Sequence, residues 1–182
     1  MDELARRIDE DFAERLAAQP GFASYEMMDC GLGEFMTMSV FLTLEQAEAS
    51  REMARRWAEE NSDLSFPRLE AAHGEIHVGR RVHETHAGDA RMPVAVRRFA
   101  VTRGSVGDLM RRVEEPDGLV FDCGGGEILW VSFVRDLDAA VESDERFARL
   151  VKEDLREFGL ERRLALRGSL LVSRARQPAR AV

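Results

Sequence analysis

The chain has 182 residues, of which 45% are hydrophobic, and this fits one ordinary globular domain or two small ones. Its formal net charge of -8 argues against nucleic-acid binding, which depends on clustered cations. No apolar run approaches the roughly 18 residues of a membrane span, and the first residues open an amphipathic pattern rather than a signal peptide. We therefore expect a cytoplasmic protein without a nucleic-acid or membrane partner.

A helix is predicted over residues 2–18. The apolar residues of its stripe recur at every fourth position, as Leu4, Ile8, Phe12 and Leu16. Pro20 and Gly21 end the helix, because proline disfavours helical geometry in the residue before it and glycine accepts turn dihedrals. A strand over residues 22–28 then runs into the turn at residues 29–33, whose glycines permit the positive φ angles of a tight hairpin.

The returning strand, over residues 35–42, alternates between two different faces. One face is apolar and carries Met36, Met38, Val40 and Leu42. The other mixes apolar side chains with hydroxyls and carries Phe35, Thr37, Ser39 and Phe41. This pattern predicts a sheet with helices behind it and, in front of the mixed face, a second sheet or an enclosed cavity.

Thr43 and Gln46 have the spacing of a capping box, in which the Thr43 hydroxyl accepts from the Gln46 amide while the Gln46 side chain reaches back. A helix is therefore expected to begin here and to end near Asn61. A strand over residues 75–82 follows. The polar, glycine-containing stretch 84–91 then marks a boundary.

The turn motif Asp29-Cys30-Gly31-Leu32-Gly33-Glu34 returns as Asp122-Cys123-Gly124-Gly125-Gly126-Glu127. Placing residues 29–50 on residues 122–143 without a gap keeps the same residue type at Asp29, Cys30, Gly31, Gly33, Glu34, Ser39, Leu44, Ala47 and Ser50. This agreement indicates a tandem repeat. We expect a first repeat over residues 1–83, a second over residues 92–174 and a flexible tail over residues 175–182.

The second copy begins with a β-branched strand over residues 93–101. Ser105 then caps a helix over residues 106–115, and the hairpin, a helix capped by Asp136 and a last strand at residues 169–173 follow. This order predicts an α+β, ferredoxin-like fold, with antiparallel strands and helices on one face. The first copy lacks the opening strand, so its sheet is either one strand short or completed from elsewhere, such as another subunit.

Several features between residues 12 and 78 occur together: Pro20, Gly21, Phe22, Tyr25, the hairpin turn, the run from Ser39 to Ser50, and Trp57. With these features the segment resembles the antibiotic biosynthesis monooxygenase-like family of the dimeric α/β-barrel superfamily. The second copy resembles this family more weakly. The resemblance implies two tandem ferredoxin-like repeats packed sheet against sheet as an intrachain dimeric α/β barrel, and it leaves further assembly into a homo-oligomer open.

The resemblance also implies candidate catalytic positions. Cofactor-independent monooxygenases of this family use an Asn and a Trp four residues apart on the third strand, and the related haem-degrading enzymes use a Trp and a downstream His on the second helix. The matching positions are Thr37 with Phe41 and Trp130 with Val134 for the first pair, and Ser50 with Glu60 and Ser143 with Glu153 for the second. Neither copy keeps either pair, so haem degradation by that route is not expected and no cofactor is predicted.

Cysteine and histidine do not define a metal site in this sequence. Cys30 and Cys123 lack the spacing of a zinc site or a disulfide framework, which indicates two free thiols in a reducing compartment. The four histidines are His73, His77, His83 and His86. A metal site would need a third ligand, which the sequence does not identify. His77 alternates with Ile76 and Val78, so we expect it on the side of the predicted cavity.

The mixed face supplies a predicted ligand site, because apolar walls with a few hydroxyls are typical of small-molecule pockets. Ser39 and Ser132 occupy matching places in the two copies. Neither serine has a neighbouring base that would activate it, so neither is a candidate nucleophile. The predicted site residues are Tyr25, Phe35, Thr37, Ser39, Phe41, His77, Ile128, Trp130 and Ser132.

Two functional hypotheses follow. The first is a protein that binds a small apolar or aromatic molecule between its sheets, as a relative of the cofactor-independent monooxygenases. The second is a non-enzymatic interaction or regulatory module, in which the same side chains fill a closed core and the hydroxyls bond to backbone groups. The packing around Trp130 and Ser39 distinguishes the two.

Overall fold

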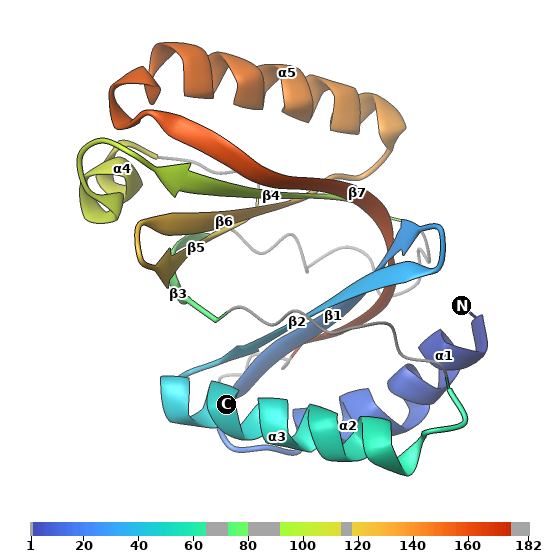
Figure 1. Cartoon of the computed structure of the whole chain (residues 1–182). Coiled ribbons are helices and arrows are strands. Elements are labelled where there is room, and N and C mark those ends of the chain that lie inside the picture. Colours follow the sequence, from blue (N-terminus) through green and yellow to red (C-terminus); the bar gives the residue numbers. More distant parts are fainter. Residues whose placement is uncertain (1, 65–72, 80–91, 114–117, 176–182) are drawn as a thin grey trace, which may run out of the picture. The chain divides into compact units, whose positions relative to one another are not determined.

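The computed structural model describes residues 2–64, 73–79, 92–113 and 118–175 (Figure 1). The elements, in chain order, are α1 (Asp2–Arg7), η1 (Ile8–Phe12), α2 (Ala13–Ala17), β1 (Phe22–Gly31), β2 (Glu34–Phe41), α3 (Leu44–Glu60), β3 (Glu75–Gly79), β4 (Pro93–Val101), α4 (Val106–Arg112), β5 (Leu119–Gly124), β6 (Glu127–Phe133), α5 (Leu137–Glu153), η2 (Arg156–Phe158) and β7 (Leu160–Ala175). The predicted α+β class is confirmed.

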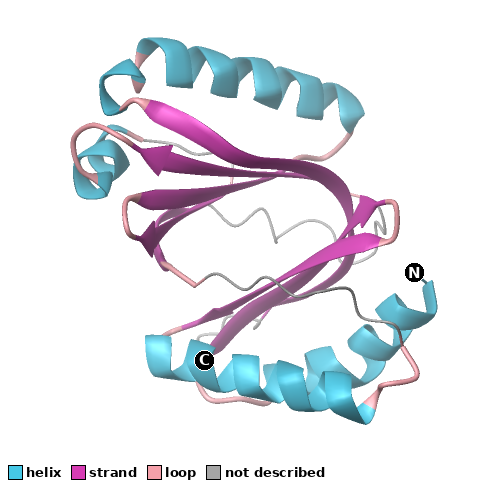
Figure 2. Cartoon of the chain, viewed as in Figure 1, coloured by secondary structure: helices cyan, strands magenta, loops and turns pink. Residues whose placement is uncertain are grey.

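The strands form a seven-stranded sheet in the order β2-β1-β7-β4-β6-β5-β3 (Figure 2). The pairs with a described register, among them β1 with β2 and β4 with β6, are antiparallel. β2 stands at one end of this order. Within the described part of the chain, no strand therefore takes the place beside β2, where the opening strand of the first repeat would be expected.

The chain divides into two compact units, which do not follow the predicted repeat boundaries. Unit 1 comprises Met1–Ala71 and Leu170–Val182, and unit 2 comprises Ala72–Ser169. The predicted last strand of the first repeat appears as β3, which pairs with β5 in unit 2 and places Ile76 opposite Phe121. β7 is longer than the strand predicted at residues 169–173, and it enters unit 1 after Ser169. Residues 80–91 and 176–182, which hold the predicted linker and most of the tail, lie outside the described residues.

The first helix of unit 1 contains a π-helical turn. The Ala13 amide donates to the carbonyl oxygen of Ile8, five residues earlier. An α-helix repeats every 3.6 residues, so side chains spaced by four drift around it, and the wider π turn reduces that drift. As a result Ile8, Phe12 and Leu16 are all buried, and Leu4 packs half-buried against the same core.

Helices cover one face of the β1–β2 hairpin in unit 1 (Figure 1). α3 begins with the predicted capping box: the Gln46 amide donates to the Thr43 hydroxyl, and the Thr43 amide donates to Gln46 Oε1. The core between the helices and the strands contains Ile8, Phe12, Ala13, Leu16, Phe22, Tyr25, Met27, Trp57 and Val172. We call this set the unit 1 core.

From β4 onward, unit 2 has the element order β4-α4-β5-β6-α5-η2-β7, and these strands lie in the order β7-β4-β6-β5, which is consistent with a ferredoxin-like fold. β3 is an additional strand beside β5. Ser105 and Asp136 cap α4 and α5 as predicted, by accepting from the amides of Asp108 and Ala139. The unit 2 core contains Phe99, Val106, Leu109, Met110, Val113, Val120, Ile128, Trp130, Leu155 and Phe158.

The two hairpin turns share one local structure. The Asp29 carboxylate accepts from the Gly31 amide at 2.8 Å, and the Asp122 carboxylate accepts from the Gly124 amide at 2.8 Å. The predicted positive φ angles are present, at 81° for Gly33 and 79° for Gly126. Leu32 is the exception at the first tip, because it is a fully exposed leucine with a φ of 54°. This conformation costs a residue with a Cβ roughly 1–2 kcal/mol.

We expect Gly33→Val and Gly126→Val each to lower the free energy of unfolding by about 1–2 kcal/mol, because a β-branched residue resists a positive φ. No atom lies within 4 Å of the Cβ position at Gly33, so backbone strain alone would cause the effect there. Leu32→Gly is the control of opposite sign and should raise stability by about 1 kcal/mol. Chemical denaturation measures all three, and unchanged stability in both valine variants would show that the turn geometry is wrong.

Candidate functional site

The predicted site residues of unit 1 share one face of the β1–β2 hairpin. Tyr25 lies directly opposite Ser39, and Met27 lies opposite Thr37. Directly paired residues point to the same side of an antiparallel sheet, and residues two apart along a strand do so as well. The strand register therefore brings Tyr25, Phe35, Thr37, Ser39 and Phe41 together on one surface.

That surface faces the helices, and the expectation that it lies in front of a second sheet or a cavity is wrong. Phe35 and Phe41 pack, half-buried, against the unit 1 core. Ser39 Oγ lies 3.3 Å from Ser50 Oγ on α3. Alternation separates the two faces of a strand, but it does not identify which one the helices cover when both are apolar. Ligand binding by these residues stays a prediction.

Tyr25 is the most informative of these residues. It is 2% exposed, and its ring forms a T-shaped contact with the Phe12 ring at a centroid distance of 5.5 Å. Tyr25 Oη is shielded from solvent and has no hydrogen-bond partner among the residues that the structure describes. The Thr37 hydroxyl lies close enough to lower the pKa of the phenol, but its contact with Oη does not have the geometry of a hydrogen bond. A buried, unsatisfied hydroxyl costs about 1–3 kcal/mol, so its retention calls for an explanation.

Burial raises the pKa of the Tyr25 phenol well above its ordinary value, and the negative charge of Glu26 adds to the rise, while the Thr37 hydroxyl opposes it. The phenol is therefore neutral throughout the physiological range. A neutral phenol can donate one hydrogen bond and accept others. This suits it to an oxygen-bearing ligand that lies among apolar side chains.

Asp11 makes a polar contact between η1 and α3 in unit 1. Its carboxylate accepts from Trp57 Nε1 at 2.7 Å and from Arg15 Nε at 2.6 Å. The Trp57 hydrogen bond is the main reason that the pKa of Asp11 lies below its ordinary value. Phe12, next to Asp11, contacts the Trp57 ring at 5.4 Å as well as Tyr25. Asp11 thus orients the Trp57 indole, which contacts Phe12 beside Tyr25.

Glu26 lies on the opposite face of β1 and was not among the predicted site residues. Its side chain is fully buried, and one carboxylate oxygen accepts from Ser24 Oγ at 3.4 Å. Its cross-strand neighbour is Met38, and Met28 and Met36 form the next pair on the same face. A charged residue inside the apolar run 22–28 is the sequence signal that could have identified it, because buried charges are costly.

In unit 2 the predicted residues also face the helices. Ile128 and Trp130 belong to the unit 2 core, and the Trp130 ring forms a T-shaped contact with the Phe147 ring on α5 at a centroid distance of 4.9 Å. Ser132 accepts from Arg97 Nη1 at 3.2 Å. Helix side chains therefore occupy this side of the sheet, and ligand binding by Ile128, Trp130 and Ser132 stays a prediction.

Arg97 is the centre of a buried ionic contact between β4 and α5. Its guanidinium pairs with the Asp144 carboxylate and lies over the Phe147 ring, 4.5 Å from the centroid. Asp144 also pairs with Arg167 on β7, whose side chain is 78% exposed. Arg97 and Asp144 were missed by sequence reasoning. The signal was an arginine within the β-branched run 93–101, where a charge needs a partner.

The remaining sequence candidates do not form a site in the described part. His77 belongs to β3, but its side chain lies outside the described part of the structure, as do His83 and His86. His73 is exposed. Over residues 2–64, 73–79, 92–113 and 118–175, no cluster of three or more His, Cys, Asp and Glu side chains could hold a metal ion. Cys30 and Cys123 are free and half-buried, and burial raises the pKa of both thiols.

A surface depression of about 400 Å³ lies elsewhere in unit 2. Its lining residues are Gly104, Asp108, Arg111, Arg112, Glu157 and Phe158. The two arginines are already paired, Arg111 with Asp108 and Arg112 with Glu157. None of the predicted site residues lines this depression, and its charges satisfy one another.

Tyr25 is the only tyrosine of the chain, so its titration can be followed directly. The ordinary pKa of a tyrosine side chain is about 10. We expect no tyrosinate absorbance from the native protein at that pH. Burial raises the pKa of the phenol in the folded state, so folding favours the neutral phenol. The contribution of this preference to the free energy of unfolding is complete below that pH and is lost as the pH rises beyond it. Ultraviolet absorbance and circular dichroism should therefore change together at higher pH. Reversible ionisation near pH 10 in the folded protein would contradict the burial of Tyr25.

Arg97→Ala should lower the free energy of unfolding by about 3 kcal/mol, because it removes one partner of a largely buried ion pair. The matched control is Arg167→Ala, which removes the exposed arginine from the same Asp144 and should cost at most about 1 kcal/mol. Thermal and chemical unfolding measure both. Equal losses in the two variants would show that the Arg97 contact is no stronger than a surface ion pair.

No helix of the described residues combines the length and apolar character required to cross a membrane.

Comparison with known proteins identifies no relative of the chain. No family model, curated protein or solved structure matches the chain, so its function has to be inferred from its own side chains.

Proposed function

We propose that unit 1 binds a small, uncharged aromatic molecule on the helix-covered face of the β1–β2 hairpin, with Tyr25 as the polar anchor. The observation that supports this proposal is the Tyr25 hydroxyl, which is inaccessible to solvent and lacks a hydrogen-bond partner within the described residues. A ligand oxygen placed against Oη would satisfy it. The hydroxyl would then contribute specificity instead of an uncompensated cost.

The neighbours of Tyr25 define the chemical class of the ligand. Aromatic rings dominate, with Phe12 and Trp57 in the unit 1 core and Phe35 and Phe41 half-buried beside it. On the same side of the sheet, the Asp11 carboxylate already accepts from Trp57 and Arg15. An apolar environment with a neutral donor favours a flat, uncharged molecule that carries a hydroxyl or carbonyl oxygen.

We also propose that the chain arose by duplication of a ferredoxin-like unit and belongs to the dimeric α/β-barrel superfamily, as the sequence resemblance implies. The equivalent Asp–Gly hydrogen bonds at 2.8 Å in the two hairpins and the equivalent caps at Thr43 and Asp136 support a common origin. A relation to cofactor-independent monooxygenases stays a prediction, since Thr37 and Phe41 replace the expected pair. The proposed activity is therefore binding.

A second candidate is a non-enzymatic interaction module with a closed core. Leu32 favours it, because a leucine that is fully exposed at a hairpin tip and held at a φ of 54° has no role in packing. The close contacts of Trp130 and Ser132 with Phe147 and Arg97 also fit a filled core in unit 2. In this case Tyr25 would be only a structural residue.

Tyr25→Phe separates the two candidates. It removes one oxygen and keeps the ring, so the variant should be as stable as the wild type or more stable by about 1 kcal/mol, because the buried hydroxyl is unsatisfied. Under the ligand proposal, 1-naphthol should bind the wild-type protein about fivefold more tightly than the variant, as expected for the loss of one neutral hydrogen bond. Isothermal titration calorimetry measures both affinities.

A matched ligand supplies the control. 1-Methylnaphthalene keeps the ring system without the oxygen, so it should bind wild type and Tyr25→Phe equally. Absence of saturable 1-naphthol binding, or equal 1-naphthol affinity in both proteins, would refute the ligand proposal. A gain of stability without any effect on binding would favour the interaction module.

A further inference from the structure

β2 stands at one end of the sheet, and within the described part of the chain β1 is its one neighbouring strand. We propose that the other edge of β2 pairs antiparallel with β2 of a second copy of the chain, so that two copies form a two-fold symmetric dimer. This inference goes beyond the proposed function and does not depend on a ligand at Tyr25.

The sequence and register of β2 contain none of the devices that usually protect an edge strand. An edge presents unpaired N–H and C=O groups, and proteins guard it with short strands, charged residues, prolines or bulges. β2 spans eight residues, Glu34–Phe41, without a proline, and its charged residue, Glu34, stands at its start. The two shifts in the β1–β2 register place the extra residue, Ala23 or Cys30, on β1. β2 is therefore a regular and uncharged strand, suited to further pairing.

Unit 2 indicates the orientation of the partner strand. The alignment of residues 29–50 with residues 122–143 matches β2 with β6, with Glu34 on Glu127 and Ser39 on Ser132. β6 pairs antiparallel with β5 across its hairpin and antiparallel with β4 on its other side. The position that corresponds to β4 is the one beside β2. An antiparallel strand is therefore expected there.

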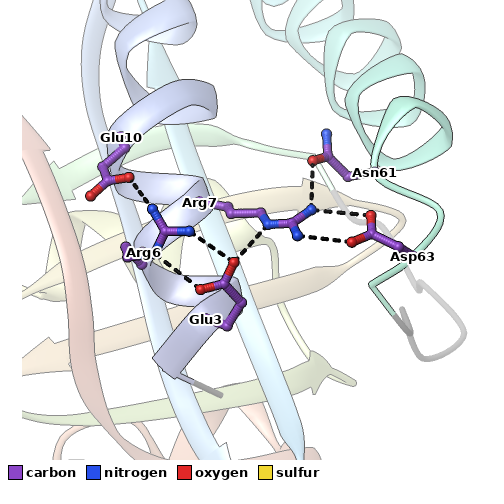
Figure 3. Close-up of polar contacts among 6 residues, drawn as sticks. All are labelled: Glu3, Arg6, Arg7, Glu10, Asn61 and Asp63. Carbon is purple, nitrogen blue, oxygen red and sulfur yellow. Dashed lines mark hydrogen bonds and ion pairs between the residues drawn. The ribbon is translucent and has the colours of Figure 1, made fainter.

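The first segment of the chain does not supply this strand. Residues 2–7 form the helix α1, and Arg7 joins this helix to the residues that follow α3 (Figure 3). Arg7 donates to Asp63 at 3.1 Å and to Asn61 at 3.4 Å, while Glu3 accepts from Arg7 Nε at 2.8 Å. These contacts hold α1 against the chain after α3 as a helix.

Exposed leucines flank β2 and favour a second copy as the partner. Leu32 is fully exposed just before the strand, and Leu42 and Leu44 are 76% and 58% exposed just after it. Antiparallel pairing of two β2 strands brings the start of each strand to the end of the other. The leucines of one copy would then meet those of the second copy, and both sets would leave water.

Charge and parity select a register for this pairing. With Thr37 on the two-fold axis, Leu32 lies beside Leu42 of the second copy, and Glu34 lies opposite Val40. The two Glu34 carboxylates are then at opposite ends of the contact, whereas parallel pairing would place them side by side, which is unfavourable. Thr37 is an exposed residue, as this position requires.

Sedimentation equilibrium of the full chain tests the dimer. The wild type should approach twice its mass of 20.6 kDa as the concentration rises. Leu42→Lys should raise the dissociation constant of the dimer about tenfold, because two-fold symmetry places the lysine in the contact twice. Val141→Lys is the matched control: it puts the same charge on an exposed residue of α5 and should leave the dissociation constant unchanged.

Two results of this experiment would overturn the proposal. One is a wild-type chain that is still monomeric at about 1 mM, as it would be if another part of the chain covered the edge. The other is a dimer that Leu42→Lys weakens no more than Val141→Lys does. Dimer formation is measured without 1-naphthol, so failure of the dimer and failure of the proposed function are distinguishable.

Cross-linking tests the register. In a background with Cys30→Ser and Cys123→Ser, Thr37→Cys should form a disulfide-linked dimer under mild oxidation. A residue on the axis meets its own copy with the Cβ atoms about 5 Å apart, close to the spacing of a disulfide. Val141→Cys in the same background should stay unlinked. A dimer in which Thr37→Cys links no better than Val141→Cys would refute pairing through β2.

Discussion

The register of the β1–β2 hairpin is the constraint on which the account of unit 1 depends. Because Tyr25 is paired with Ser39, and Glu26 with Met38, alternate residues of β1 point to opposite faces. A slip by one residue would exchange the faces, moving Glu26 under the helices and Tyr25 away from Phe12. The capping box at Thr43 and the positive φ angles at the hairpin turn hold this register from its two ends.

The helix-covered faces of the two units use polar groups differently. In unit 2, Arg97 on β4 pairs with Asp144, donates to Ser132 and lies over the Phe147 ring. Its buried charge therefore has partners, and these contacts position α5. In unit 1 the buried phenol of Tyr25 finds no equivalent set of partners within the residues that are described. A binding function therefore fits unit 1 better than unit 2, although sequence reasoning assigned both the same role.

Local features were predictable from the sequence, and long-range ones were not. The hairpin turns, the caps at Thr43, Ser105 and Asp136, and most strands follow from short patterns whose chemistry acts within a few residues. The face covered by helices was not predictable, since both faces of β2 carry large apolar side chains. The pairing of β3 with β5, and the length of β7, depend on contacts between distant residues that periodicity does not encode. The strict four-residue spacing from Leu4 to Leu16 was a usable sign of the π turn.

The central claim is that the Tyr25 hydroxyl is available to a ligand, and a high-resolution crystal structure of the chain soaked with 1-naphthol tests it most directly. The account predicts density for the naphthol ring beside Phe12, with its oxygen within hydrogen-bond distance of Tyr25 Oη. A protein group that already satisfies Oη, with no room for a ligand beside it, would contradict the account.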